Sequence, residues 1–535
     1  MFRKIIKKLR LRQILQQNAK KKSQDNSSSK QTKLSHQLQD NLTLFRNILG
    51  QNSDLVIREF SFGGDGKTKA ALIFFDGLVD KEIINESIIK PLMYDSHLFS
   101  PQQLKRQQSF DFLEKKMISV GEVKRISSVD DLLNDCLYGD TVFLIDNFAE
   151  ALIINTKGWE FRGVTEPKTE AVVRGPREGF TETLNVSISL LRRKIRHPDL
   201  IMEKMQLGEK TKTEVCLAYL KGVVSSGLVA EVKTRLQSIK TDAILESGYI
   251  EQFIEDAPFS PFPTVANSEK PDVVAAKLLE GRVAILVDGT PMVLTVPMLF
   301  VEGFQTAEDY YSRPYYVSFI RFLRFISFFI SLLAPGAYVA LTTFHQELIP
   351  TPLLLTIAAA REGAPFPVVV EILLMGLFFE IIREAGIRLP RPIGSAISIV
   401  GALVIGEAAV SAGLIGAPIV IVIAITAITS FVVISLADVV LLLRLLLILA
   451  AAFLGGFGII IFLLGLLIHL TTLRSFGAPY FAPFAPLNLR GLKDTVIRAP
   501  LWAMGTRPQA ISTVNRRRQK FGLLPQPPSK QGNGE

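Results

Sequence analysis

The stretch KAALIFFDGLV (residues 69–79) is apolar for six residues and then reaches a polar turn at Asp76 and Gly77. Such a run is typical of a β-strand buried on both faces. The stretch EVCLAYLKGVV (214–224) has the same pattern at an offset of 145 residues (214 − 69), with Gly222 in the place of Gly77. Each stretch is followed by a helix-like segment. The sequence therefore predicts a strand–turn–helix unit that occurs twice.

A second pair of segments has a similar spacing. GDTVFLIDNFAEALIIN (139–155) reads as two strands joined by a turn at Asp146, and GRVAILVDGTPMVLTVP (281–297) places Asp288 at the same point. The offset is 142 residues (281 − 139). We interpret the two pairs as two related α/β subdomains, with chance similarity of two βα units as the alternative.

Composition divides the chain into a charged part and an apolar part. Of the 535 residues 48% are hydrophobic and 21% are charged, yet 325–470 is almost wholly apolar. The predicted fold class is α+β, multi-domain: a soluble N-terminal region of two α/β subdomains followed by a polytopic α-helical membrane domain. The predicted segments are a basic amphipathic segment and disordered linker (1–41), α/β subdomain 1 (42–165), a connecting helical segment (166–204), α/β subdomain 2 and membrane entry (205–316), the transmembrane domain of four to six segments (317–472) and a basic cytoplasmic tail, partly disordered (473–535).

The formal net charge of +10 is concentrated at the two ends of the chain. Residues 1–40 contain eleven Lys or Arg, and residues 474–535 contain ten. Basic ends on a membrane protein favour contact with anionic lipid over nucleic acid. Residues 1–17 have helical apolar spacing, which fits a helix on the membrane surface or equally a solvated tail.

The residues offer little support for an enzyme. The two cysteines, Cys136 and Cys216, have no metal-ligand spacing and indicate a reducing compartment. SFGGDGKT (61–68) lacks the first glycine of a phosphate-binding loop and joins two predicted strands, so it reads as a hairpin turn. We expect no catalytic site, no metal and no cofactor.

The apolar part contains several candidate membrane spans. They are Phe325–Phe344, Gly363–Ile382, Ile393–Ala412, Leu414–Leu436 and Leu445–Ile468, with Leu348–Ala360 too short to cross. The positive-inside rule places Arg321, Arg324 and the Arg383–Arg391 loop in the cytoplasm. Five crossings would put the basic tail outside, so we expect that 363–382 or 393–412 does not cross and that both ends are cytoplasmic.

One predicted helix carries a carboxylate among small residues. In GALVIGEAAVSAG (401–413), Glu407 belongs to a stripe that we predict faces a pore: Val400, Leu403, Glu407, Ser411 and Leu414. A stripe of small residues on another face is predicted to pack against a helix: Gly394, Ser398, Ala402 and Gly406. At 100° per residue the stripes lie about 160° apart. A ring of carboxylates would favour cations, whereas a protonated or paired Glu407 would be structural.

Two further carboxylates lie in the apolar part. Glu371 and Glu380 are nine residues apart (380 − 371), which places them on opposite sides of one helix. Glu380 can pair with Arg383 on its own face. Structural ion pairs and ion handling are both open for these two residues, with pairing favoured.

Several long motifs resemble one protein family. The chain is similar to the A subunits of GerA-type spore germination receptors over roughly 45–510. The resemblance is carried by RGPREGFTETL (174–184), SPFPTV (260–265), GRVAILVDGTP (281–291), TVPMLFVEGFQTAEDYY (295–311), ALTTFHQELIPTPLLLTIAAAREGAPFP (340–367), REAGIRLPRPIGSAISIVGALVIG (383–406) and LRSFGAPYFAP (473–483). The family pattern has Gln where this chain has Glu407.

The resemblance implies a subunit of a nutrient-sensing complex in the spore inner membrane that triggers germination. It implies a large N-terminal region on the cytoplasmic (spore core) side, a transporter-like B subunit that binds the nutrient, and a lipoprotein C subunit. It also implies oligomerisation, as a pentamer, into a ligand-gated cation channel. A non-conducting scaffold that relays the signal is the alternative. A secondary transporter is disfavoured because no inverted repeat is evident in 317–470.

Overall fold

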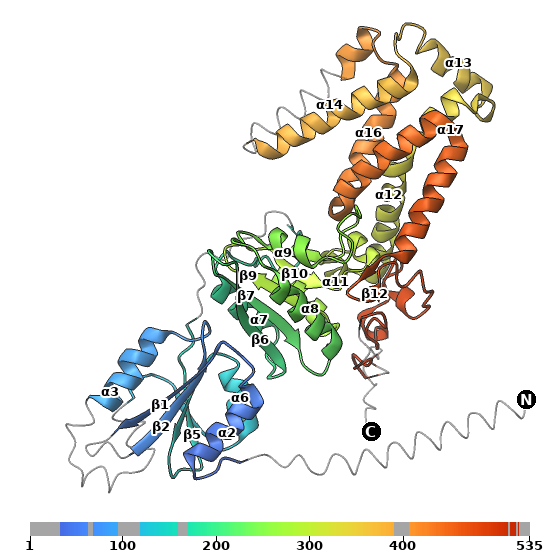
Figure 1. Cartoon of the computed structure of the whole chain (residues 1–535). Helices are drawn as coiled ribbons and strands as arrows, with labels where there is room; N and C mark the ends of the chain where they lie inside the picture. Colours follow the sequence, from blue (N-terminus) through green and yellow to red (C-terminus); the bar gives the residue numbers. More distant parts are fainter. Residues whose placement is uncertain are drawn as a thin grey trace, which may run out of the picture. The chain divides into compact units, whose positions relative to one another are not determined.

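The computed structural model describes residues 33–62, 68–94, 118–158, 170, 172–389, 406–511, 514–520 and 523 (Figure 1). The chain forms two compact units, one of residues 1–163 and 188–203 and the other of residues 164–187 and 204–535. The basic segment predicted for 1–17 lies outside the described residues.

The first unit contains a five-stranded antiparallel sheet in the order β1-β2-β4-β5-β3. Its strands are β1 (Leu55–Phe62), β2 (Thr68–Phe75), β3 (Val123–Ile126), β4 (Thr141–Ile145) and β5 (Ala151–Ile154). Its helices are α2 (Leu38–Leu49), the π-helical η1 (Ile83–Ile89), α3 (Lys90–Met93) and α6 (Val129–Cys136). β1 and β2 pair as the predicted hairpin around the 61–68 stretch.

Both faces of this sheet are covered, which explains why β2 is apolar without alternation. Ala71, Ile73 and Phe75 share a core with α2 and α6. Ala70, Leu72 and Phe74 share a core with η1 and α3 on the other face.

A second α/β subdomain repeats this architecture; its residues 188–203 belong to the first compact unit and the rest to the second. Its sheet has the order β6-β7-β9-β10-β8, which is the strand order of the first sheet position by position. The strands are β6 (Leu200–Leu207), β7 (Thr213–Leu220), β8 (Ala266–Ser268), β9 (Val283–Val287) and β10 (Val293–Val296). The helices of this part are α7 (Leu184–Lys194), α8 (Ser226–Ser238), α9 (Ser247–Ile254) and α10 (Pro271–Leu279).

The repeat extends to single hydrogen bonds at the turns. The Asp146 carboxylate accepts the backbone N–H of Leu38, the first residue of α2, at 3.0 Å. The Asp288 carboxylate accepts the N–H of Leu184, the first residue of α7, also at 3.0 Å. The next residue has a positive φ in both repeats, 70° at Asn147 and 88° at the equivalent glycine. A side-chain acceptor for the free N–H groups of a helix start stabilises the helix.

The sequence places α7 in a connecting segment (166–204). Its Asp288 cap matches the Asp146 cap of α2, as expected if α7 is the counterpart of α2 at the start of the second repeat. The sequence signal was weak there, because only β-strand and turn residues match clearly between the repeats.

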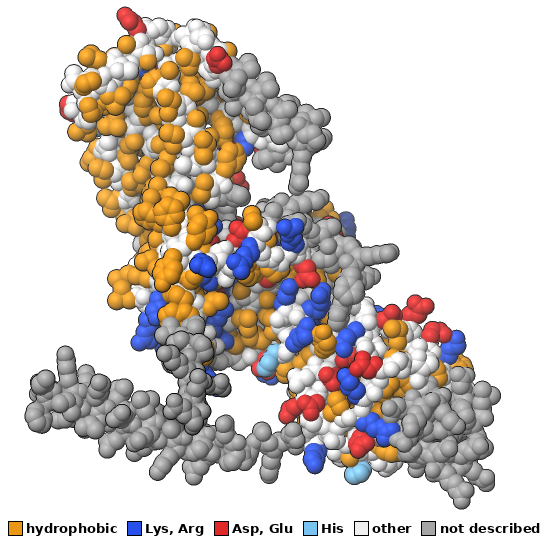
Figure 2. Space-filling model, turned by 180° about the vertical axis from the view of Figure 1, so that it is seen from behind, with side chains coloured by type: hydrophobic (Ala, Val, Ile, Leu, Met, Phe, Trp, Pro, Cys, Tyr) orange, Lys and Arg blue, Asp and Glu red, His pale blue; other side chains and the backbone are white. Residues whose placement is uncertain are grey.

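The helical part follows through η4 (Phe300–Phe304) and α11 (Glu308–Tyr311). It comprises α12 (Pro314–Thr343), η5 (Gln346–Leu348), α13 (Thr351–Ala359), α14 (Val368–Arg388), a helical stretch at 406–411, α16 (Ala417–Val432), η6 (Ile434–Leu436) and α17 (Ala437–Thr472). Figure 1 shows α12, α16 and α17 side by side. Among the described residues, α12 is long and apolar enough to cross a membrane, and so is α17 by total length and composition, although its helix is interrupted at Gly455. α16 is a shorter apolar helix. On the face shown in Figure 2, hydrophobic side chains cover this part of the molecule.

α17 is two helices joined by a sharp reversal. Gly455 has φ 60° and ψ −140°, which is not helical. A side chain on Gly458 would overlap the carbonyl oxygen of Ala450, eight residues earlier, although eight residues of a continuous helix span about 12 Å. Leu443 and Leu470, from the two arms, lie in one hydrophobic cluster. The single span predicted for Leu445–Ile468 is therefore wrong, because the chain turns back in its middle.

Much of the C-terminal tail is folded. It contains β11 (Arg474–Ser475), β12 (Ala478–Pro479), η7 (Gly491–Lys493) and η8 (Leu501–Ala503). Ser475 Oγ accepts the N–H of Met298 at 3.0 Å and donates to the carbonyl of Thr264 at 2.6 Å. Tyr480 is fully buried in the core that contains Phe300. Residues 473–511 of the segment that was predicted as a tail are thus folded onto the second unit.

Candidate functional site

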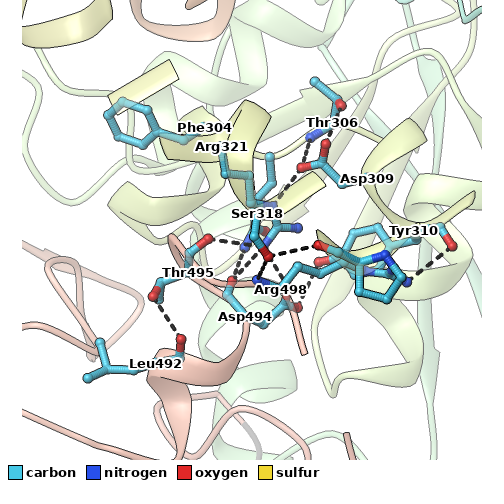
Figure 3. Close-up of polar contacts among 12 residues, drawn as sticks. Phe304, Thr306, Asp309, Tyr310, Ser318, Arg321, Leu492, Asp494, Thr495 and Arg498 are labelled. Carbon is cyan, nitrogen blue, oxygen red and sulfur yellow. Dashed lines mark hydrogen bonds and ion pairs between the residues drawn. The ribbon is translucent and has the colours of Figure 1, made fainter. Parts of the chain in front are cut away.

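The described part of the chain contains one dense polar cluster where the second α/β subdomain continues into α12. It is formed by α11, the first turns of α12 and tail residues 494–498, and we call it the entry junction (Figure 3). Pro314 starts α12, as suits a residue without a backbone N–H. Before it, the Asp309 carboxylate accepts the N–H and the hydroxyl of Thr306 at 3.3 and 3.2 Å, which closes the turn into α11.

Arg321 is the centre of the junction and is fully buried. Its Nε donates to Asp309 at 2.7 Å, and one terminal nitrogen donates to the Asp494 carboxylate at 2.8 Å. The same nitrogen also contacts the backbone carbonyls of Asp494 and Thr495 at 3.1 Å. A guanidinium can serve several acceptors at once because its donors form a planar fork. Arg321 thus joins α11, α12 and the tail.

Arg324, one turn further along α12, completes the charge balance. Its guanidinium lies 2.9 Å from the Asp309 carboxylate and 3.0 Å from the carbonyl oxygen of Phe304. Two arginines therefore face two aspartates, and a buried set of charges is tolerated when it is paired in this way. Both arginines are thus paired with carboxylates of the same chain.

The tail is held at two further points. Arg498 donates to the carbonyl oxygens of Ser312 at 3.0 Å and Tyr310 at 3.3 Å. The Tyr310 hydroxyl donates to the Asp494 carboxylate at 2.8 Å. Burial, and then the Asp494 charge, raise the pKa of Tyr310 well above its usual value, so that the phenol keeps its proton. The hydrogen bond from Tyr310 to Asp494 therefore does not depend on a change in the protonation of Tyr310 near neutral pH.

The RGPREG segment reaches the same region from the other side of α11. The backbone N–H groups of Val173 and Arg174 donate to Glu308 in α11, the second at 3.2 Å. Gly175 has φ 145°, and a Cβ there would lie 2.8 Å from the Tyr311 ring, so only glycine fits. The segment that leads into the second repeat is thereby attached to the chain that leads into α12.

These contacts join α11, the start of α12 and the tail in one polar network. Arg321 and Arg324 are paired with Asp309 and Asp494, whereas Arg498 bonds backbone carbonyls. Among the described residues no three His, Cys, Asp or Glu side chains are grouped to hold a metal ion. Burial raises the pKa of the Cys136 thiol to about 12, so the thiol is protonated and unreactive.

Comparison with known proteins identifies the family. The family model described as "Bacillus/Clostridium GerA spore germination protein" matches residues 43–510. This chain belongs to the GerA family. It is 46% identical over 501 residues to spore germination protein KA of Bacillus subtilis (strain 168), covering 93% of this chain and 91% of that protein. It is 43% identical over 471 residues to spore germination protein GerLA of Bacillus cereus, covering 88% and 94% of the two chains.

Among solved structures, a similar chain is the crystal structure of the N-terminal domain of the A subunit of the Bacillus megaterium spore germinant receptor GerK3. The identity is 36%, the TM-score is 0.39, and the match covers 50% of this chain and 98% of that one.

The two predicted stripes of the Glu407 helix in this GerA protein are described only in part. Gly406 is buried, and a Cβ on it would lie 3.6 Å from the Val420 side chain. Glu407, Ser411 and Leu414 are exposed, but the helical stretch ends at 411, so Leu414 lies beyond it in a bend. The remaining members of the stripes lie outside the described residues: Gly394, Ser398, Val400, Ala402 and Leu403.

Glu371 and Glu380 both have cationic partners within the chain. Glu371 is fully buried, 2.8 Å from Arg361, and accepts the N–H of Gly416 at 2.9 Å. Glu380 lies 2.8 Å from Arg383 in its own helix and 2.7 Å from Arg444 in α17. Arg444, which directly precedes the predicted span Leu445–Ile468, lies inside α17 and ties it to α14.

The two aspartates of the entry junction, Asp309 and Asp494, were not predicted from the sequence. Asp309 lies in the TVPMLFVEGFQTAEDYY motif, and Asp494 is one of two acidic residues among the ten basic residues of 474–535. An isolated carboxylate in a basic tail was a usable signal for a specific partner. The partner itself could not be found, because Arg321 and Asp494 are 173 residues apart in the chain.

Proposed function

We propose that this chain is the A subunit of a germinant receptor in the inner membrane of the spore, and that it oligomerises, as a pentamer, around a ligand-gated path for cations. Its membership of the GerA family supports the role in germination. Its partners in the proposal are a transporter-like B subunit, which binds the nutrient, and a lipoprotein C subunit.

The observation that carries the channel proposal is the exposed Glu407. Glu371 and Glu380 are neutralised by arginines of the same chain, whereas no ion pair to Glu407 occurs among the residues that the structure describes. A carboxylate exposed to lipid costs about 3 kcal/mol at the centre of a bilayer. Glu407 is therefore expected to face water or another subunit, as it would in a ring of carboxylates that attracts cations.

In this proposal the two stripes of the helix have separate roles. The pore-facing residues are Val400, Leu403, Glu407, Ser411 and Leu414. The residues that pack against a neighbouring helix are Gly394, Ser398, Ala402 and Gly406, of which Gly406 is buried against Val420.

The proposed topology is multi-pass, with the α/β subdomains and the tail both on the spore core side. The start of α12 and the end of α17 support it. Arg321 in α12 bonds tail residue Asp494, and His469, near the end of α17, is 2.8 Å from Ser260 of the second subdomain. The chain thus enters and leaves the helical part next to the same subdomain, which supports an even number of crossings.

A non-conducting relay is the second candidate, and the entry junction favours it. The junction joins the second subdomain, α12 and the tail, so a movement of the subdomain reaches the helices without any pore.

Replacement of Glu407 tests the channel. In a spore former that carries the gene, Glu407→Gln should retain nutrient-triggered release of monovalent cations, because Gln is the residue of the family pattern. Glu407→Lys should reduce the release about tenfold or more, since a ring of ammonium groups repels cations. Glu347→Lys, at an exposed carboxylate in η5, is the matched control and should leave the release unchanged. Equal release in all variants, at equal protein levels, would remove Glu407 from the mechanism.

A further inference from the structure

The second unit contains a cavity of about 280 Å³ that the cation path does not use. It lies between the start of β9 with η4 on one side and the folded tail on the other. Its body is aliphatic, lined by Leu299, Val301, Ala482, Pro483, Pro508 and Ala510. Pockets for drug-sized ligands begin at about 300 Å³, so this one suits a compact molecule.

Charged residues form part of the cavity lining. Arg282 is 3% exposed and lines it. One terminal nitrogen of Arg282 donates to Glu302, and the other lies 3.3 Å from Glu280. Its Nε is buried and has no hydrogen-bond partner within the described part of the chain. A buried N–H without an acceptor costs about 1–3 kcal/mol, so the site is short of one acceptor.

Glu280 is short of donors. It also lines the cavity, and its bond from Arg282 is long at 3.3 Å. The other carboxylate oxygen is 3.9 Å from Arg518, beyond hydrogen-bond length. Burial raises the pKa of the Glu280 carboxyl, as expected for an acid that lacks compensating donors. An unpaired donor, Arg282 Nε, and a weakly paired carboxylate, Glu280, thus lie side by side in the lining of the cavity.

The charges around this part of the lining are balanced. Lys277 and Arg282 face Glu302 and Glu280, with Lys277 3.3 Å from Glu302, and Asp494, which also lines the cavity, is paired with Arg321. A ligand with a net charge would leave one buried charge uncompensated, which is costly. The site therefore selects a neutral or internally neutralised head group.

We propose that this cavity binds a compact, net-neutral molecule with an aliphatic body, whose head group offers an acceptor to Arg282 Nε and a donor to Glu280. The inference is independent of the cation path, because it concerns binding to the folded second unit.

Occupancy of the cavity is coupled to α12 through shared residues. Gln305, Asp494 and Thr495 line the cavity, and Gln305 donates to the Asp494 carbonyl oxygen at 2.6 Å. The Asp494 carboxylate in turn holds Arg321. A ligand that orders these residues also orders the entry junction, so the ligand stabilises one position of α12.

The test uses the full chain in lipid nanodiscs and three probes of nearly equal size. Isovaleramide carries both an acceptor and a donor and is neutral, isovalerate lacks the donor, and isoamylamine lacks the acceptor. Isovaleramide at saturating concentration should raise the melting temperature of the protein by about 3 °C. The two charged probes should bind at least about tenfold more weakly, since each leaves one buried group unpaired.

Two variants and a control complete the test. Ala510→Leu fills the cavity and should abolish the shift, whereas Ala503→Leu, outside the cavity, should retain it. Glu280→Gln removes one negative charge without changing shape and should move the preference towards isovalerate. The proposal is overturned by the absence of any isovaleramide shift, by equal binding of the three probes, or by an unchanged preference in Glu280→Gln.

Discussion

Replacement of Arg321 by Met is the sharpest perturbation of the entry junction. The side chain is fully buried and bonds Asp309 at 2.7 Å and Asp494 at 2.8 Å. Breaking a buried ion pair from one side costs about 3–5 kcal/mol. Asp309 keeps Arg324 at 2.9 Å, and the Asp494 side chain is 30% exposed, so the lower end of that range applies. We expect a loss of about 3 kcal/mol and, at about 2 cal/mol/K of unfolding entropy per residue in a unit of this size, a fall in melting temperature of about 4 °C.

The assay follows the tail as well as the melting temperature. Trp502 is 43% exposed in η8, and only one other tryptophan, Trp159, is present in the chain. In a Trp159→Phe background, the fluorescence of Trp502 should change in Arg321→Met at a temperature where the parent is unaltered. Arg324→Met is the matched control, and it should cost only about half as much because Asp309 retains Arg321.

A double-mutant cycle separates the ion pair from simple packing. Asp494→Asn in the Arg321→Met background should restore about 1 kcal/mol or more, because the uncompensated charge is removed. Equal melting temperatures of Arg321→Met and Arg324→Met, or no coupling between Arg321 and Asp494, would refute the view that this pair holds the tail to α12.

Two further predictions concern the backbone reversal at Gly455 in α17 and the protonation of Glu251 in α9. Gly455→Ala should destabilise the protein by about 1–3 kcal/mol, because φ is 60° and a Cβ would lie 2.9 Å from the side chain of Phe344. Thermal unfolding measures this, with Gly465→Ala, where a Cβ meets nothing within 4 Å, as the control that should be neutral or stabilising. Burial, and then two neighbouring glutamates, raise the pKa of Glu251 from 4.5 to about 7. The folded state therefore binds this proton more tightly than the unfolded state, and stability falls as pH rises from about 4.5 to about 7. Glu251→Gln should remove that fall and gain about 1–2 kcal/mol at pH 8.

Each of the predictions for Gly455 and Glu251 has an outcome that would contradict it. If Gly455→Ala and Gly465→Ala have the same melting temperature, the chain does not require a positive φ at the reversal. If Glu251→Gln is equally stabilising at pH 5 and pH 8, the effect is not the titration of Glu251.

The α/β half could be predicted from the sequence because its repeat is marked by special backbone positions. Gly77 and Gly222 have φ of 83° and 77°, and Gly139 and Gly281 have φ of 102° and 99°, values that strongly favour glycine. Asp146 is equivalent to Asp288 because both cap a helix. Such positions tolerate few residue types, so the repeat can be recognised from a single sequence.

The structure of the helical half was harder to predict from the sequence, because different apolar residues can occupy the same positions in it. The reversal at Gly455 lies within a hydrophobic run, and hydropathy does not distinguish a span from a hairpin. The entry junction was missed for another reason. The pairing of Arg321 with Asp309 is near in sequence, but that with Asp494 depends on the tertiary fold.

Current across a planar bilayer containing the purified, assembled receptor tests the central proposal most directly. The account predicts a nutrient-dependent current that is selective for cations, and loss of that selectivity in Glu407→Lys. A correctly assembled oligomer that passes no current, or a current whose reversal potential is unaffected by Glu407→Lys, would contradict it. The former result would leave the non-conducting relay through the entry junction as the function of this GerA protein.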